Sequence, residues 1–130
     1  MGEMKKYVHE AGFPIEIRQD NLPESSFDDL DLSGSGFNDV NLYQTRFTDI
    51  NLAESKFQCV NLNDVHFGCV NMQNARFETP CMRHARFERC DLSYSQFSDC
   101  DLEGATIDGI DILELLRCYQ EKKRAAAPAP

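Results

Sequence analysis

The chain has 130 residues and a formal net charge of −9, from 13 basic and 22 acidic residues. This length fits a single domain. The acidic balance argues against direct binding to nucleic-acid phosphates, which needs clustered lysine and arginine. No run of about 18 apolar residues is present that could cross a membrane, so we expect no membrane partner.

Residues 1–16 precede the first regular pattern in the chain. They contain basic residues but no apolar stretch of the kind found in signal peptides, so we expect a cytoplasmic protein. Three apolar side chains, Tyr7, Val8 and Phe13, predict that this segment caps the structure that follows. In the cytoplasm the six cysteines are expected to be free thiols.

Residues 17–112 carry a large apolar residue at every fifth position, without insertion or deletion. On a helix, five residues advance by about 500°, so these side chains would never form one face. On a continuous strand, an odd step places successive side chains on opposite faces. The chain must therefore bend once per repeat to keep every large residue inside. This pattern predicts an all-β solenoid built from short straight pieces.

A second position supports the solenoid. Two residues before each large residue, the side chain is mostly small or β-branched, as in Ser35, Val40 and Thr45, and the assignment runs on to Ile110. We expect these side chains to point inward as well. The remaining three positions of the repeat are mostly polar and predict a solvated surface.

The repeats resemble those of the pentapeptide-repeat family, whose pattern reads roughly A-(D/N)-L-x-x. Matching units include Val40-Asn41-Leu42, Val60-Asn61-Leu62 and Cys90-Asp91-Leu92, and the resemblance covers residues 17–112. It implies a right-handed quadrilateral parallel β-helix with four repeats per coil, and therefore about five coils. Because phenylalanine alternates with leucine or methionine, Phe residues are then expected to stack on two opposite faces.

One segment departs from the repeat pattern. Residues 79–84 place Pro80 at the second inward position and Cys81 where the family has aspartate or asparagine. Since proline removes a backbone donor, we expect a bulge or a missing hydrogen bond there. The sequence does not assign a role to this irregularity.

Residues 113–124 predict a C-terminal helix, followed by a disordered tail at 125–130. The apolar stripe of this helix is wider than a single capping face needs. We therefore hypothesise a homodimer through the helix, and the resemblance adds that DNA-mimicking members of the family pair through their C-terminal ends. The candidate dimer residues are Leu113, Leu115, Leu116 and Tyr119.

The sequence offers no catalytic, cofactor or metal site. His66 is expected to be a solvated surface imidazole, and no phosphate loop or nucleophile motif is present. Cys81 and His84 point outward whereas Cys90 and Cys100 point inward, so they should not converge on zinc. We therefore expect a protein that is not an enzyme.

An outward Asp or Asn precedes most Leu and Met positions, and two interpretations of it stay open. These residues can satisfy turns by binding neighbouring backbone. They can also form an acidic surface for a protein partner, with the candidates Asp31, Asp91, Asp101 and Asp111.

Two functions follow from this sequence. The first is a protein-interaction module with an unidentified partner. The alternative is mimicry of DNA toward DNA gyrase or another DNA-binding protein, because the family includes fluoroquinolone-resistance proteins that act in this way. Between residues 25 and 109 there are fourteen acidic and six basic residues, so the charge supports mimicry only weakly.

Overall fold

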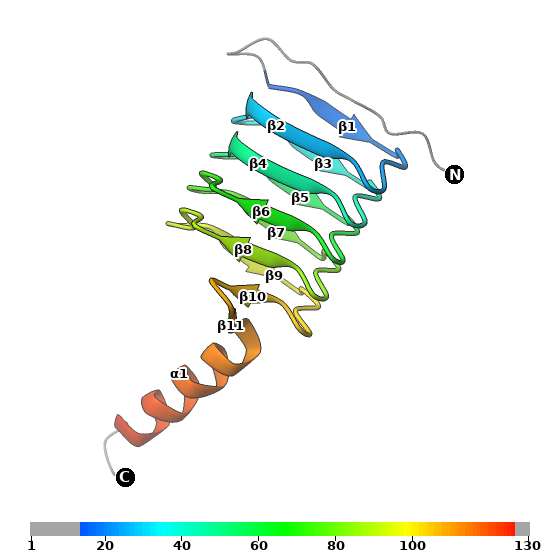
Figure 1. Cartoon of the computed structure of the whole chain (residues 1–130). Helices are drawn as coiled ribbons and strands as arrows, with labels where there is room; N and C mark the ends of the chain where they lie inside the picture. Colours follow the sequence, from blue (N-terminus) through cyan, green and yellow to red (C-terminus); the bar gives the residue numbers. More distant parts are fainter. Residues whose placement is uncertain (1–13, 127–130) are drawn as a thin grey trace.

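A computed structural model describes residues 14–126 of the chain. It shows a stack of coils with a parallel sheet on each of two opposite sides, followed by one helix (Figure 1). The first sheet contains β1 (Glu16–Arg18), β3 (Gly36–Asn38), β5 (Lys56–Gln58), β7 (Arg76–Glu78) and β9 (Gln96–Ser98). The second contains β2 (Ser26–Asp31), β4 (Arg46–Asn51), β6 (His66–Gly68), β8 (Arg86–Glu88), β10 (Thr106–Ile107) and β11 (Ile110–Asp111). Helix α1 spans Ile112–Ala126.

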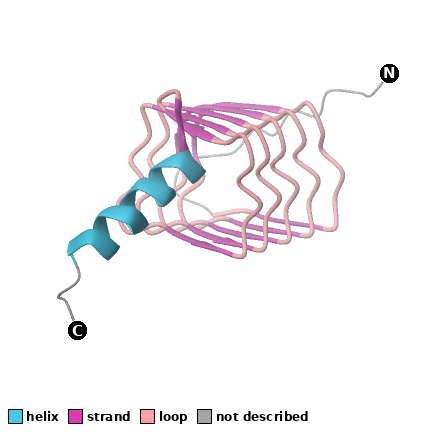
Figure 2. Cartoon of the chain, turned by 90° about the horizontal axis from the view of Figure 1, so that it is seen from below, coloured by secondary structure: helices cyan, strands magenta, loops and turns pink. Residues whose placement is uncertain are grey.

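From β1 to β8, each strand pairs in parallel with the strand that lies twenty residues later in the chain. Phe37 is opposite Phe57, and Phe47 is opposite Phe67. Isolated bridges such as Asn41–Asn61 continue the same register on the two remaining sides. A shift of twenty residues equals four repeats, so the predicted parallel β-helix is confirmed. Figure 2 shows the two sheets facing each other across the coil, joined by loops.

The bend that the repeat requires lies two residues after each large residue. Every fifth residue from Gln19 to Gly104 has a positive φ, for example 53° at Asp49 and 60° at Asn74. This left-handed conformation turns the chain, and asparagine, aspartate and glycine adopt it at the lowest cost. The polar outer positions of the repeat therefore serve the turns as well as the surface.

The core consists of aligned side-chain stacks, as the alternation of residues predicted. Phe37 and Phe57 stack with ring centroids 4.7 Å apart and an interplanar angle of 4°. Across the core, Phe57 meets Phe67 edge to face at 6.5 Å and 87°. Both arrangements are favourable for aromatic rings and add to the burial of apolar surface.

The second inward position is buried through most of the stack. Its hydroxyl groups are satisfied by backbone: Ser25 Oγ donates to the Leu22 carbonyl at 2.8 Å. The prediction was wrong at Ile110, which is 53% exposed. Here β10 and β11 form an antiparallel hairpin, which turns the chain back and ends the repeat geometry.

The irregularity expected at Pro80 does not occur. Cys81 keeps both of its bridges, to Asn61 and Asp101, and its N–H donates to the Val60 carbonyl at 3.1 Å. Val60, at the equivalent position of the previous coil, donates no backbone hydrogen bond through its own N–H to any residue between 14 and 126. Proline therefore occupies a position whose donor the coil does not use, so it costs no ladder hydrogen bond.

The predicted boundaries shift slightly at both ends. Strand β1 begins at Glu16, inside the segment expected to be a cap, and residues 1–13 of that segment lie outside the described residues. The helix begins at Ile112 and continues to Ala126, so two residues of the expected tail are helical, and residues 127–130 of that tail lie outside the described residues. None of the described helices is long and apolar enough to span a membrane.

Candidate functional site

The C-terminal end of the solenoid presents apolar surface. Phe97, the last ring of its stack, is 38% exposed, whereas Phe77 beneath it is fully buried. A hollow of about 460 Å³ opens at this end. Its lining is formed by Phe87, Phe97, Asp99, Cys100, Leu102, Ile107, Ile112 and Leu116. The last coil thus lacks the cover that every inner coil receives from its neighbour.

Helix α1 projects away from this end instead of lying across it (Figures 1 and 2). The antiparallel hairpin β10–β11 sets its direction, and the Asp111 carboxylate caps its first turn by accepting the Glu114 N–H at 3.1 Å. None of the helix residues is buried. The predicted dimer residues Leu113, Leu115, Leu116 and Tyr119 are all exposed, by 42–62%.

The charges of α1 are arranged along its length. Arg117 pairs with Glu114 and with Glu121, which lie one turn before and after it. The last turn carries Lys123 and Arg124, which suit the negative end of the helix dipole. Neither of these two residues forms an ion pair with any other residue in the described part of the chain.

Two cysteines lie beside the open end, at inward positions. Burial raises the pKa of the Cys100 thiol to about 11 and also raises the pKa of the Cys90 thiol. Both thiols donate to backbone carbonyls, Cys90 Sγ to Phe67 at 3.3 Å. They are therefore protonated packing groups at neutral pH, and all six cysteines of the chain are unpaired.

The four acidic candidates take part in local structure. Asp31, Asp91 and Asp101 each accept the N–H of the residue two positions later, at 3.0–3.3 Å. Asn41, Asn51, Asn61 and Asn71 make the same contact in their own coils. The turn interpretation is therefore confirmed for this position, whereas a role of the carboxylates in partner binding stays a prediction.

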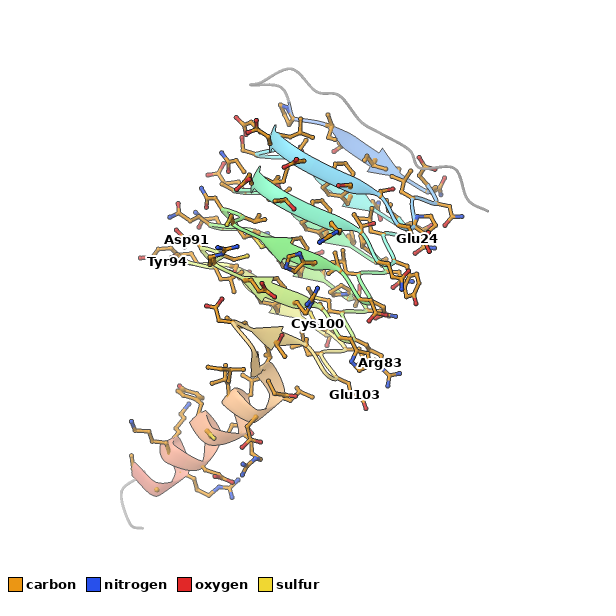
Figure 3. All side chains as sticks on the ribbon, in the orientation of Figure 1. Glu24, Arg83, Asp91, Tyr94, Cys100 and Glu103 are labelled. Carbon is orange, nitrogen blue, oxygen red and sulfur yellow. The ribbon has the colours of Figure 1, made fainter. Side chains whose placement is uncertain are left out.

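Asp91 also accepts hydrogen bonds from side chains. It accepts hydrogen bonds from the Ser93 hydroxyl at 2.6 Å and from Gln73 at 2.7 Å, in addition to the Ser93 N–H. The hydrogen bonds from Ser93 and Gln73 lower the pKa of this carboxyl below its usual value. Figure 3 shows Asp91 beside Tyr94 on one side of the solenoid, opposite the side that carries Arg83 and Glu103.

The side that carries Asp91 has an unusual composition. Its segments 31–34, 51–54, 71–74 and 91–94 contain no lysine, arginine or histidine. Tyr94 is 84% exposed on this side. We call these four segments the base-free face. Sequence reasoning missed this face because the charges were counted over all sides together.

His66 differs from its prediction as a solvated imidazole. Its side chain is only 19% exposed, since the ring packs over Gly68, where the absence of a Cβ makes room. The signal for this contact is a glycine two residues after the histidine on the same strand. Among residues 14–126, no group of three or more metal-ligating side chains lies close enough together to hold a metal ion.

Comparison with known proteins agrees with the geometry. The model of the pentapeptide repeat region matches residues 47–115, more than half of the chain. The chain belongs to the pentapeptide-repeat family. Members of this family are generally structural or interaction modules without enzymatic activity. Comparison with curated proteins finds no match.

Solved pentapeptide-repeat structures resemble the chain at low identity. A protein of the Arabidopsis thaliana thylakoid lumen has a TM-score of 0.67 and 12% identity, over 83% of this chain and 75% of that one. Rfr23 from the cyanobacterium Cyanothece has a TM-score of 0.35 and 15% identity, over 72% and 88%. QnrB1, a plasmid-mediated fluoroquinolone resistance protein, has a TM-score of 0.35 and 9% identity, over 91% and 100%. The first of these shows the shared fold.

Proposed function

We propose that the protein is a non-enzymatic interaction module whose C-terminal end binds a protein partner, first of all a second copy of the chain. The observation that carries this proposal is the apolar hollow beside a helix with four exposed apolar side chains. Solenoids need a cover over their terminal coils, because uncovered apolar ends associate. The free thiols fit a cytoplasmic location, which is part of the proposal.

Charge complementarity favours a second copy as the occupant. The helix ends in Lys123 and Arg124, whereas the last coil carries Asp99, Asp101 and Glu103. If the helix of one copy lies over the hollow of the other, the basic end of each helix reaches an acidic coil. The same surface is then used twice, as a two-fold axis requires. A helix of this length, about 22 Å, can contribute a large part of the roughly 800 Å² per partner that stable interfaces bury.

The alternative is mimicry of DNA toward gyrase or another DNA-binding protein. The base-free face supports it, since a basic protein would meet carboxylates there without a competing cation. The face carries only Asp31, Glu54 and Asp91 over four coils. Duplex DNA of that length, about 14 Å, would carry roughly eight charges. The interaction module is therefore the function that we favour.

Light scattering on the purified chain tests self-association. We expect twice the chain mass of 14.8 kDa at micromolar concentration. Leu116→Glu should give a monomer, because it places a charge in the hollow. Asn38→Glu adds the same charge on exposed β3, far from this end, and should leave the dimer intact.

A monomeric mass for the unchanged chain would remove the second copy as the occupant. Affinity capture with the unchanged chain and with Leu116→Glu then tests whether another protein uses this end. Recovery of a topoisomerase by both proteins would instead favour mimicry through the sides of the solenoid.

A further inference from the structure

A groove follows one edge of the solenoid, between the outer face of the second sheet and the turns that precede its strands. Its volume is about 710 Å³. Two arginines and two histidines line it, Arg46, Arg86, His66 and His84, together with the acids Glu24 and Asp64. Figure 3 shows Glu24 toward the first coils, on the side that carries Arg83 and Glu103 further along the stack.

The sheet register stacks three of these side chains directly. His66 is opposite Arg46 on one neighbouring strand and opposite Arg86 on the other. Arg46 and Arg86 therefore lie two strands apart on the same column, with His66 between them. Exposed outward positions can be filled by any polar residue, so this column is not a requirement of the fold.

The column is poorly neutralised, although the chain has an excess of acidic residues. Arg46 forms no ion pair with the residues that the structure describes. The carboxylate nearest to Arg86 is Glu88, whose oxygen is 3.9 Å away. Glu88 also lies 3.5 Å from His66 Nε2, so one carboxylate is shared between two groups.

His66 adds an independent observation. Its Nδ1 atom is buried and has no hydrogen-bond partner within the described part of the chain. Buried polar atoms in folded proteins nearly always have a partner, because an unpaired one carries a desolvation penalty. The two arginines on either side of His66, only one of which has a carboxylate within 4 Å among the described residues, indicate a place for an anionic group.

We propose that this groove binds a phosphate group at the level of His66, between Arg46 and Arg86. Adjacent strands are about 4.8 Å apart, so the two arginines start about 10 Å from each other and can reach a central group from both sides. Guanidinium groups match phosphate oxygens in bidentate geometry. A phosphate monoester offers three terminal oxygens, which suits two arginines and an imidazole better than a single carboxylate does.

Inorganic phosphate is the first probe, added to the full chain at constant ionic strength and followed by NMR. We expect saturable shifts of the His66 and Gly68 signals. Arg46→Gln and Arg86→Gln should each weaken binding about tenfold, because each removes a charge-assisted contact. Arg76→Gln is the matched control, since Arg76 holds the same repeat position on the first sheet and is not part of the groove.

The source of the phosphate is distinguished by two further ligands. A phosphoserine peptide that binds more tightly than glycerol 3-phosphate assigns the groove to a modified protein partner, and equal binding assigns it to a small phosphate ester. The unphosphorylated peptide should not bind. Chemical shifts that fail to saturate below about 10 mM phosphate would overturn the proposal. A loss of phosphate affinity in Arg76→Gln as large as that in Arg46→Gln and Arg86→Gln would also overturn it.

Discussion

The contribution of a phenylalanine to stability depends on its position in the aromatic stack. Phe57 has a phenylalanine above and below it in the stack, at 4.7 and 4.8 Å between ring centroids, and is fully buried. We expect Phe57→Ala to lower the free energy of unfolding by about 3–5 kcal/mol, from lost burial and a remaining cavity. Phe97→Ala should cost less, because that ring is partly exposed. Urea denaturation measures the free energy of unfolding of both variants. An equal loss of stability in the two would contradict the conclusion that the C-terminal coil is uncovered.

Asp91 predicts a specific pH dependence. Its pKa is lowered in the folded state by the Ser93 and Gln73 hydrogen bonds, so its contribution to stability is present above the unfolded-state pKa. That contribution is lost as pH falls through the lowered folded-state pKa. In Asp91→Asn the amide oxygen can keep the turn, as Asn71 does one coil earlier. We expect the urea midpoint of this variant to fall less between pH 7 and pH 3 than that of the unchanged chain.

The cysteines predict an order of reactivity. Cys59, Cys81 and Cys118 are exposed, whereas burial raises the pKa of Cys90 and Cys100. Ellman's reagent at pH 8 should therefore modify the three exposed thiols first, because thiolate content and access both control the rate. Denatured protein without reductant should release close to six thiols. Finding two or fewer would contradict free cysteines.

At the scale of the element, the coil tolerates proline at one position and not at the next. Pro80 occupies a position whose backbone N–H makes no ladder hydrogen bond, whereas the Cys81 N–H donates to the Val60 carbonyl. Pro80→Ala should change the free energy of unfolding by less than about 1 kcal/mol. Cys81→Pro should cost about 3 kcal/mol or more, since it removes a ladder hydrogen bond. Thermal and urea unfolding of the two variants provide the comparison.

The regular part of the fold follows from the sequence because one period controls it. A large residue at every fifth position fixes the inward direction, and the Phe alternation fixes the stacks. The hairpin β10–β11 could not be predicted from this period, because the large apolar residues continue without interruption through Ile107 and Ile112. The chain nevertheless leaves the repeat geometry between them, where Asp108 and Gly109 both have positive φ. The site depends on this hairpin, which aims the helix away from the last coil. The apolar helix residues were therefore predictable, but their exposure beside an open hollow was not.

At the scale of the whole molecule, stability should decrease toward the open end. Inner coils contact a neighbour on both sides, as expected for a solenoid whose energy is a sum of adjacent interfaces. We expect amide exchange to be slowest in β5 and β7 and faster in β9 and β10. If the C-terminal end pairs with a second copy, exchange in β9 and β10 should slow as protein concentration rises. Concentration-independent exchange there would contradict self-association.

The twenty-residue register also determines how such a chain can grow by duplication. An added unit of five residues keeps every large side chain inside, but it rotates all later outward residues by one side of the prism. Phenylalanine would then meet leucine in each stack, and the column of Arg46, His66 and Arg86 would be divided between two sides. Ten added residues restore the alternation of the core and still exchange opposite surfaces. Only a duplicated unit of twenty residues preserves both the side-chain stacks of the core and the outward columns. Shorter duplications are therefore compatible with the core but not with the binding faces.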